Sequence, residues 1–460
     1  MDLVVIDSAL SEVSRSVVTG NYYEVINKEV IESNYRYRAG EITHGDIVSR
    51  IIQNTSNNSI TIHYIKLFQD GERGNVDDLV SALKWCLSNR IEIINLSIGS
   101  YLQQDYWKLR EIIGLLIQNN CKIIAACNNY GYFTSPANMS GVLGVKAFSE
   151  IRMEMVDKPC ISGEYVLAQG QFKFDSLGTT NANSYAAAYV TAICADSAGE
   201  KENSLFIQYR RKLLSYSFFP DFLADTVIVS SVLEDNLSDF FFFKCRIIKS
   251  IQEIKKEKGI KYIVFDGVVD EDEVYNFLDQ RDEIFGVAVM GKISIGLAQN
   301  IRSNGHRLLW TLYEYKRYIK TCCTIQKNKC CSIPVVWINC DGDIESISLA
   351  KKAKDTLTKN KYNSVITTTN SIEVLFGFYY NPNIQWGEYL GYLQSYLRLD
   401  AVIICDEKER FPEFLADIFV DSPKQIYKID DNKIEISKET WTTSLELSKK
   451  ILFSLENGYS

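Results

Sequence analysis

The sequence predicts an α/β protein in which a mostly parallel sheet flanked by helices is followed by two smaller α/β units. Short apolar runs alternate with amphipathic segments of helical spacing along most of the chain. At 460 residues the chain exceeds the roughly 250–300 residues at which a single hydrophobic core stops growing. Hydrophobic residues make up 46% and charged residues 23%, which is typical of a globular protein with a large core.

Residues 1–204 are predicted to form the first domain. Apolar runs predict strands at 3–6, 60–67, 91–96 and 122–126. Amphipathic segments between these runs predict helices at 44–52, 76–89 and 106–118. Residues 195–204 are small and charged, which is typical of a helix end followed by a linker.

Two further α/β domains are predicted at 205–325 and 326–460. Their expected strands are 226–229, 262–265 and 287–290 in the former, and 334–338, 364–367 and 401–405 in the latter. The aromatic run Phe240–Phe243 is predicted to be a strand buried on both faces.

Charge and hydropathy exclude two classes of partner. The net charge of −8 and the pI near 5.3 provide no basic surface for nucleic acid or an anionic membrane. No apolar run approaches the roughly 20 residues that cross a bilayer. The first residues lack the basic and apolar stretches of a signal peptide, so export is not expected. We therefore expect neither nucleic-acid nor membrane binding.

The twelve cysteines predict reduced thiols rather than a disulfide framework. Their irregular spacing in a long chain favours a cytoplasmic protein. The adjacent pairs Cys322-Cys323 and Cys330-Cys331 do not match the spaced pairs of zinc sites. No metal and no cofactor are expected.

Three residues carry the groups that a serine hydrolase needs, namely a nucleophile, a base and a carboxylate that orients the base. Asp7 ends the first predicted strand, and active sites of open α/β sheets lie at that edge. His44 starts a predicted amphipathic helix. Ser184 opens an alanine-rich helix whose dipole favours negative charge. The sequence therefore predicts a triad of Asp7, His44 and Ser184.

Each of these residues also has a structural interpretation. Histidines often serve structure, and a serine before a helix is commonly its N-cap. Among the other histidines, His63 is expected to be a satisfied strand residue and His306 a surface loop residue.

With their neighbours, these residues resemble the subtilisin-like serine protease family over residues 1 to about 200. The order Asp, His, Ser matches that family. Five segments carry the resemblance in register: Val4–Ser8, Thr43–Val48, Ile93–Gly99, Ile123–Gly131 and Asn181–Val190. The resemblance implies that Asn129 is the oxyanion donor. It also implies that the substrate is bound by Ser97, Ile98 and Gly99 through strand addition, and by Ala125, Ala126 and Cys127.

The chain departs from the family pattern around the nucleophile. Ala182-Asn183 stand where the family usually has Gly-Thr, and Ala187-Ala188 where it has Ser-Pro. Asn128 replaces the glycine that precedes the oxyanion asparagine. Larger side chains at these places are expected to tilt the nucleophile or narrow the pocket.

Residues 225–460 resemble, more faintly, proteins of bacterial maturation systems for ribosomally made peptides. Segments 361–366 and 374–378 of the last domain are similar to a degenerate P-loop-like fold, but residues 339–343 lack the glycine-rich phosphate-binding pattern. Nucleotide-dependent chemistry is therefore the least favoured function.

The predicted function is that of an intracellular serine endopeptidase that cleaves a peptide or precursor peptide during ribosomal-peptide maturation. The region after residue 204 is expected to recognise the precursor or a partner protein of the maturation system. The alternative is a catalytically weak or inactive protease-fold protein that binds peptides or serves as a scaffold.

Overall fold

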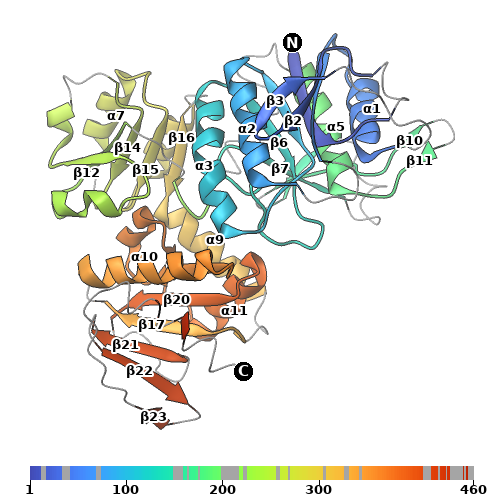
Figure 1. Cartoon of the computed structure of the whole chain (residues 1–460). Helices are drawn as coiled ribbons and strands as arrows, with labels where there is room; N and C mark the ends of the chain where they lie inside the picture. Colours follow the sequence, from blue (N-terminus) through green and yellow to red (C-terminus); the bar gives the residue numbers. More distant parts are fainter. Residues whose placement is uncertain are drawn as a thin grey trace. The chain divides into compact units, whose positions relative to one another are not determined.

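The computed structural model divides the chain into two compact units, Met1–Ser217 and Phe218–Ser460 (Figure 1). The structure describes residues 1–11, 17–33, 42–68, 74–148, 159–162, 165–174, 177–197, 217–220, 225–254, 259–267, 270–303, 307–325, 331–340, 344–407, 416–422, 425–430, 433–435, 449 and 452–453. The predicted boundary after residue 204 lies outside these ranges. The predicted division at 325/326 stays a prediction, because both later sheets belong to the second unit.

A nine-stranded sheet forms the centre of the first unit, in the order β3-β2-β4-β1-β5-β6-β7-β9-β8. Neighbouring strands from β2 to β9 run parallel, and antiparallel hairpins close both edges. The strands are β1 (Asp2–Ser8), β2 (Tyr22–Ile26), β3 (Glu29–Glu32), β4 (Thr61–Phe68), β5 (Ile93–Leu96), β6 (Lys122–Ala126), β7 (Leu143–Ala147), β8 (Cys160–Ser162) and β9 (Tyr165–Ala168). A separate hairpin pairs β10 (Lys173–Phe174) with β11 (Leu177–Gly178).

Helices cover both faces of this sheet (Figure 1). One face carries α1 (His44–Thr55) and α5 (Asn183–Asp196), which pack against each other, and the other carries α2 (Val76–Ser88) and α3 (Gln103–Gln118). Side chains alternate along a strand, so Leu3, Val5 and Asp7 of β1 all face α1 and α5. The sheet thereby directs the Asp7 carboxylate toward the two helices that begin near His44 and Ser184.

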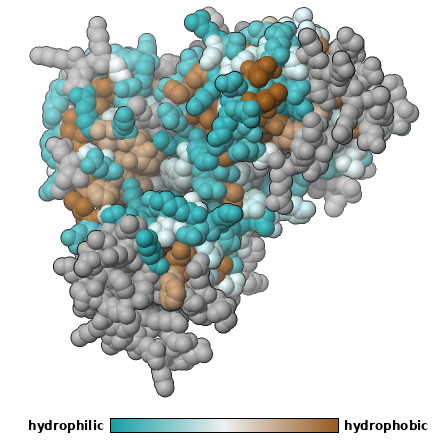
Figure 2. All heavy atoms as spheres, viewed as in Figure 1, coloured by the Kyte–Doolittle hydropathy of each residue, from teal (hydrophilic) through white to brown (hydrophobic). Residues whose placement is uncertain are grey.

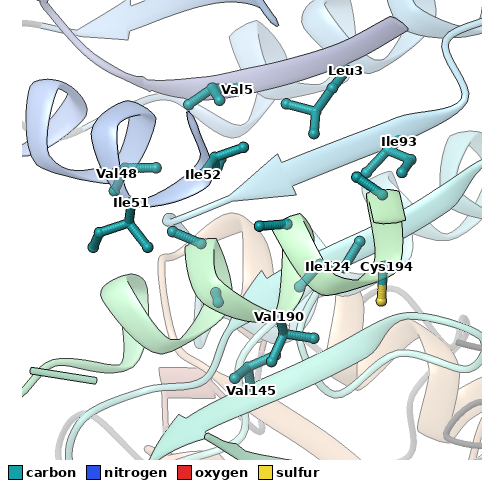
Figure 3. Close-up of a cluster of buried hydrophobic side chains, with 14 of the residues drawn as sticks. Leu3, Val5, Val48, Ile51, Ile52, Ile93, Ile124, Val145, Val190 and Cys194 are labelled. Carbon is teal, nitrogen blue, oxygen red and sulfur yellow. The ribbon is translucent and has the colours of Figure 1, made fainter. Parts of the chain in front are cut away.

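The core beneath α1 and α5 is built from branched residues of the strands and small residues of α5. Figure 3 shows Ile52 of α1 near Val5 of β1, and Val190 of α5 near Val145 of β7, all within one buried cluster. The alanines of α5 at 186, 187, 188, 192 and 195 are buried. Their small side chains let the helix lie close to the sheet, which fixes the position of its first turn.

Most predicted elements of the first unit are confirmed, and β6 matches its predicted bounds. The fold class, a mixed α/β protein with parallel sheets flanked by helices, is likewise confirmed. The β2–β3 hairpin had no predicted counterpart. Its residues are mostly half-buried or exposed, so they lack the continuous apolar run that marked the central strands.

The first sheet of the second unit has five parallel strands in the order β13-β12-β14-β15-β16. The strands are β12 (Thr226–Val229), β13 (Cys245–Ile248), β14 (Tyr262–Phe265), β15 (Gly286–Val289) and β16 (Leu308–Thr311). The helices of this region are η3 (Asp235–Phe240), η4 (Ile251–Ile254), α7 (Glu271–Asp279), α8 (Ile295–Ser303) and α9 (Leu312–Ile325).

Seven strands form the other sheet, in the order β19-β18-β20-β17-β21-β22-β23. They are β17 (Val335–Asn339), β18 (Ser364–Thr368), β19 (Tyr379–Tyr380), β20 (Ala401–Asp406), β21 (Ile418–Ser422), β22 (Gln425–Asp430) and β23 (Lys433–Glu435). Its helices are α10 (Ile344–Lys359), η5 (Ser371–Phe376) and α11 (Trp386–Leu397), and the outward surface of α10 is hydrophilic (Figure 2). The P-loop-like resemblance of this region stays a prediction. Within the described residues, every helix is too short or too polar to cross a membrane.

The prediction of a strand at Phe240–Phe243 is wrong. Phe240 ends the 3-10 helix η3, and residues 241–243 form bends. The rings instead pack as a cluster in which Phe241 lies 5.2 Å from Phe376 and 5.8 Å from Phe243 between ring centroids. An aromatic run indicates that a segment is buried, but it has no spacing that distinguishes a strand from other structures. It therefore fits an irregular buried segment as well as a strand.

Asp196 offers a test of how firmly α1 and α5 are joined. Its carboxylate accepts hydrogen bonds from Ser56 Oγ at 2.7 Å, Asn57 N at 3.0 Å and Asn58 N at 3.1 Å, just beyond α1. We expect Asp196→Ala to lower the free energy of unfolding by roughly 1.5–3 kcal/mol at pH 7. Chemical denaturation measures this loss, with the exposed Glu111→Ala as control, expected to change stability by less than about 0.5 kcal/mol.

The stability difference between wild type and Asp196→Ala should also depend on pH. Burial raises the pKa of Asp196, but its hydrogen bonds outweigh burial and hold the pKa below its ordinary value. A lowered pKa stabilises the folded state above the ordinary aspartate range, and this stabilisation is lost as pH falls through the folded-state value. The difference between wild type and Asp196→Ala should therefore shrink in acid; an equal difference at pH 7 and pH 3 would contradict the assignment.

Candidate active site

The carboxylate of Asp7 is buried at the end of β1, with 1% of the residue exposed. Its Oδ1 accepts a hydrogen bond from the N–H of Ser8 at 2.7 Å and lies 2.9 Å from His44 Nδ1. Burial raises the pKa of Asp7, but the His44 charge, its hydrogen bond, the Ser8 N–H and the Ser97 hydroxyl together hold the pKa below the ordinary value. The carboxylate is therefore ionised at neutral pH.

The first turn of α1 fixes the position of His44. Thr43 is the N-cap, and its hydroxyl accepts from Asp46 N at 3.2 Å while Asp46 accepts from Thr43 N at 2.7 Å. The other carboxylate oxygen of Asp46 accepts from Ser11 N at 3.0 Å. Because Ser11 follows β1, this buried carboxylate joins the start of α1 to the segment that leaves Asp7.

Gly45 lets the chain pass close to the core beside His44. A Cβ atom at this position would lie 1.8 Å from the hydroxyl oxygen of Tyr64. That hydroxyl donates to the backbone oxygen of Ser8 at 2.7 Å, so it also supports the residue after Asp7. The Tyr64 hydroxyl thus lies against the residues that follow His44 and Asp7, and it leaves no room for a Cβ atom at position 45.

Ser184 lies in the first turn of α5, where its hydroxyl is 2.8 Å from His44 Nε2. The N-cap of α5 is Ala182 and no side chain caps the helix, so the capping interpretation of Ser184 is wrong. Within the described residues, no acceptor bonds the N–H of Ser184, as is usual in the first turn of a helix. This leaves an oriented backbone donor beside the hydroxyl.

Asp7, His44 and Ser184 form a continuous hydrogen-bonded relay. The distances of 2.9 Å and 2.8 Å join residues that are 37 and 140 positions apart. An imidazole whose Nδ1 bonds an ionised carboxylate presents Nε2 as a base toward the serine hydroxyl. The arrangement can activate a serine for attack on a carbonyl carbon.

Asn183, which the sequence marks only as a departure from the family pattern, connects the start of α5 to two strand ends. Its Nδ2 donates to Cys127 O at 3.0 Å and its Oδ1 accepts from Ala147 N at 2.8 Å. These bonds join the start of α5 to the residues that follow β6 and end β7. An asparagine at the start of a helix gives no signal of such distant partners, so only the folded structure shows them.

The departures at Asn128 and Ala182 do not disturb the relay. Ala182 has an extended backbone, with φ −141° and ψ 145°, which any residue adopts. The backbone of Asn128 does not have a positive φ. Its Oδ1 accepts a hydrogen bond from Tyr130 N at 2.7 Å within the turn. The glycines usual at these places are therefore not required here, and Ser184 still reaches His44.

The other predicted site residues lie at or just beyond the ends of β5 and β6. Asn129 is exposed in the turn after β6, two residues beyond the Cys127 carbonyl that Asn183 binds. Ser97, Ile98 and the exposed Gly99 follow β5 directly. Ala125 and Ala126 in β6, and Cys127 after it, are buried. The oxyanion and substrate roles of these residues stay predictions.

His63 has the contacts expected of a structural histidine, because its Nδ1 accepts from Asn21 N at 3.0 Å. His306 and Cys330 lie outside the described residues. Within the described ranges the cysteines are free thiols, and no group of three or more histidine, cysteine, aspartate or glutamate residues is arranged to hold a metal ion.

No protein-family model and no curated protein matches this sequence. Among solved structures, the prenylagaramide maturation protease PagA is similar at 22% identity over 47% of this chain and 83% of that chain, with a TM-score of 0.33. The self-cleaved protease domain of PatA is similar at 18% identity over 46% and 86%, with a TM-score of 0.31. The nisin leader peptidase NisP from Lactococcus lactis is similar at 16% identity over 46% and 82%, with a TM-score of 0.34. In each case the similar region covers under half of this chain.

Replacement of Asp7 by asparagine tests the electrostatics of the relay. Because the pKa of Asp7 is lowered in the folded protein, its stabilising effect is present above the ordinary aspartate pKa and is lost as pH falls through the folded-state value. The stability of wild type relative to Asp7→Asn should therefore decrease between about pH 5 and pH 2. Denaturant unfolding of both proteins across this range measures the difference, and a difference independent of pH would show that Asp7 is not held as a carboxylate.

Proposed function

We propose that this chain is a serine endopeptidase, and the observation that carries the proposal is the Asp7–His44–Ser184 relay. Ser184 Oγ attacks the scissile carbonyl carbon and its proton moves to His44 Nε2. The ionised Asp7 orients His44 and stabilises the imidazolium. His44 then gives the proton to the leaving amine, and water hydrolyses the acyl-enzyme by the same route.

Two donors are available for the oxyanion of the tetrahedral intermediate. One is the backbone N–H of Ser184, which lies in the first turn of α5 and benefits from the helix dipole. The other is the side chain of Asn129, for which the sequence resemblance and the position after β6 are the support. Such donors stabilise charge that develops only in the transition state.

The proposed substrate is an extended peptide that pairs with the segment after β5. Within the described residues, the backbone groups of Ile98 and Gly99 form no hydrogen bonds, and Gly99 is exposed. Free backbone donors and acceptors in an extended segment can bind a peptide by strand addition. We propose a ribosomally made precursor as this peptide and a cytoplasmic location for the reaction, which the free thiols of the described residues suit.

A fluorophosphonate probe tests the nucleophile directly. The purified wild-type chain should be labelled at Ser184, whereas Ser184→Ala should show no labelling and His44→Ala a rate lower by several orders of magnitude. Peptide mapping by mass spectrometry locates the label. Ser140→Ala is the control, because that serine bonds Ser217 away from the relay, and it should be labelled like wild type. A folded wild-type chain that is never labelled would favour the peptide-binding or scaffold function.

Asn129→Ala tests the second oxyanion donor. Removal of one side-chain donor from an oxyanion hole lowers kcat by roughly 10²–10³, and a similar fall is expected here with little change in KM. Cleavage of a fluorogenic peptide library by both proteins provides the measurement. Asn119→Ala, at an exposed asparagine that follows α3, should retain wild-type kcat. An Asn129→Ala variant with unchanged kcat would remove this residue from the oxyanion site.

A further inference from the structure

Tyr185, the residue after the nucleophile, packs its ring against the ring of His44. The two centroids are 5.4 Å apart and the planes differ by 24°, which is an offset-stacked arrangement. Tyr185 is 8% exposed and belongs to the core beneath α1 and α5. The same turn of α5 thus presents the serine to one edge of the imidazole and an aromatic ring to one of its faces.

The stacking supplies a restraint that the two hydrogen bonds of His44 do not. Both bonds lie at the edge of the imidazole, at Nδ1 and Nε2. The side chain of His44 is 34% exposed, so part of it is open to solvent. A ring bonded only at its edge can swing toward that open side, which breaks both bonds at once. A buried ring on its face favours the bonded orientation through van der Waals contact.

The contact also suits the charge that the proposed reaction creates. When Ser184 Oγ gives its proton to Nε2, His44 becomes an imidazolium. The face of a tyrosine ring is electron-rich and attracts a cation that lies over it. Because Tyr185 is buried, water screens this attraction less than it would at the surface.

We propose that Tyr185 is a positioning residue that holds the His44 ring between Asp7 and Ser184 and stabilises its protonated form during proton transfer. The kinetic part of this inference rests on the proposed function, whereas the positioning part concerns the folded protein alone. The relevant feature is the aromatic ring. Tyr185→Phe keeps the ring and should behave like wild type, and Tyr185→Leu removes it while keeping an apolar side chain.

Proton NMR tests the positioning without any need for activity. The His44 Nδ1–H bonded to Asp7 should give a downfield resonance that is identified by its loss in His44→Ala. This resonance should be sharp in wild type and in Tyr185→Phe, and broadened by ring motion and solvent exchange in Tyr185→Leu. An equally sharp resonance in Tyr185→Leu would overturn the proposal. Should the leucine variant fail to fold, Tyr185→Met replaces the ring with a longer flexible side chain.

Kinetics test the consequence for proton transfer. Tyr185→Leu should lower kcat and the rate of fluorophosphonate labelling by roughly 3- to 30-fold, with KM within about 2-fold of wild type. For Tyr185→Phe, kcat, KM and the labelling rate should each stay within about 2-fold of wild type. A purely structural role would instead lower the melting temperature and the labelled fraction of molecules in Tyr185→Leu without lowering the rate for the remainder. If wild type itself is never labelled, the proposed function fails, while the NMR comparison still decides the role of Tyr185.

Discussion

A single buried carboxylate, that of Asp7, sets the conditions that the rest of the site must meet. An ionised group with 1% exposure is costly unless hydrogen bonds and an opposite charge surround it. The chain meets this need at Oδ1, with the Ser8 N–H and the His44 imidazole. Each of these partners must in turn be held in place. This requirement explains why so many contacts of the first unit converge near the end of β1.

The supports of the relay come from the sheet and from polar side chains that join distant segments. Asp46 joins the start of α1 to the exit of β1, and Asn183 joins the start of α5 to the ends of β6 and β7. Asp196 joins the far end of α5 to the segment after α1. The two helices are therefore bound at both ends, while alanines between those ends allow close packing. Small shifts of either helix would lengthen the 2.8 Å contact between His44 and Ser184.

The sequence predicts those parts of the fold and the site that depend on local pattern. Buried parallel strands are continuous apolar runs, and α5 is rich in alanine, so the central strands and the helix of Ser184 were predictable. Asp7 could be predicted as a site residue because it ends such a run. The roles of Asp46, Asn183 and Tyr185 depend on partners far along the chain, which no local pattern encodes. The error at Phe240–Phe243 has the same origin, because aromatic burial there comes from distant rings such as Phe376.

The long separation of the relay residues has a consequence for how the chain is made. Asp7 and His44 leave the ribosome well before Ser184, and β6, β7 and β9 must be in place before α5 can dock on them. Contacts of such high sequence separation form late in folding. Under the proposed function, a growing chain therefore has no activated serine of its own until Ser184 has been made and α5 has docked.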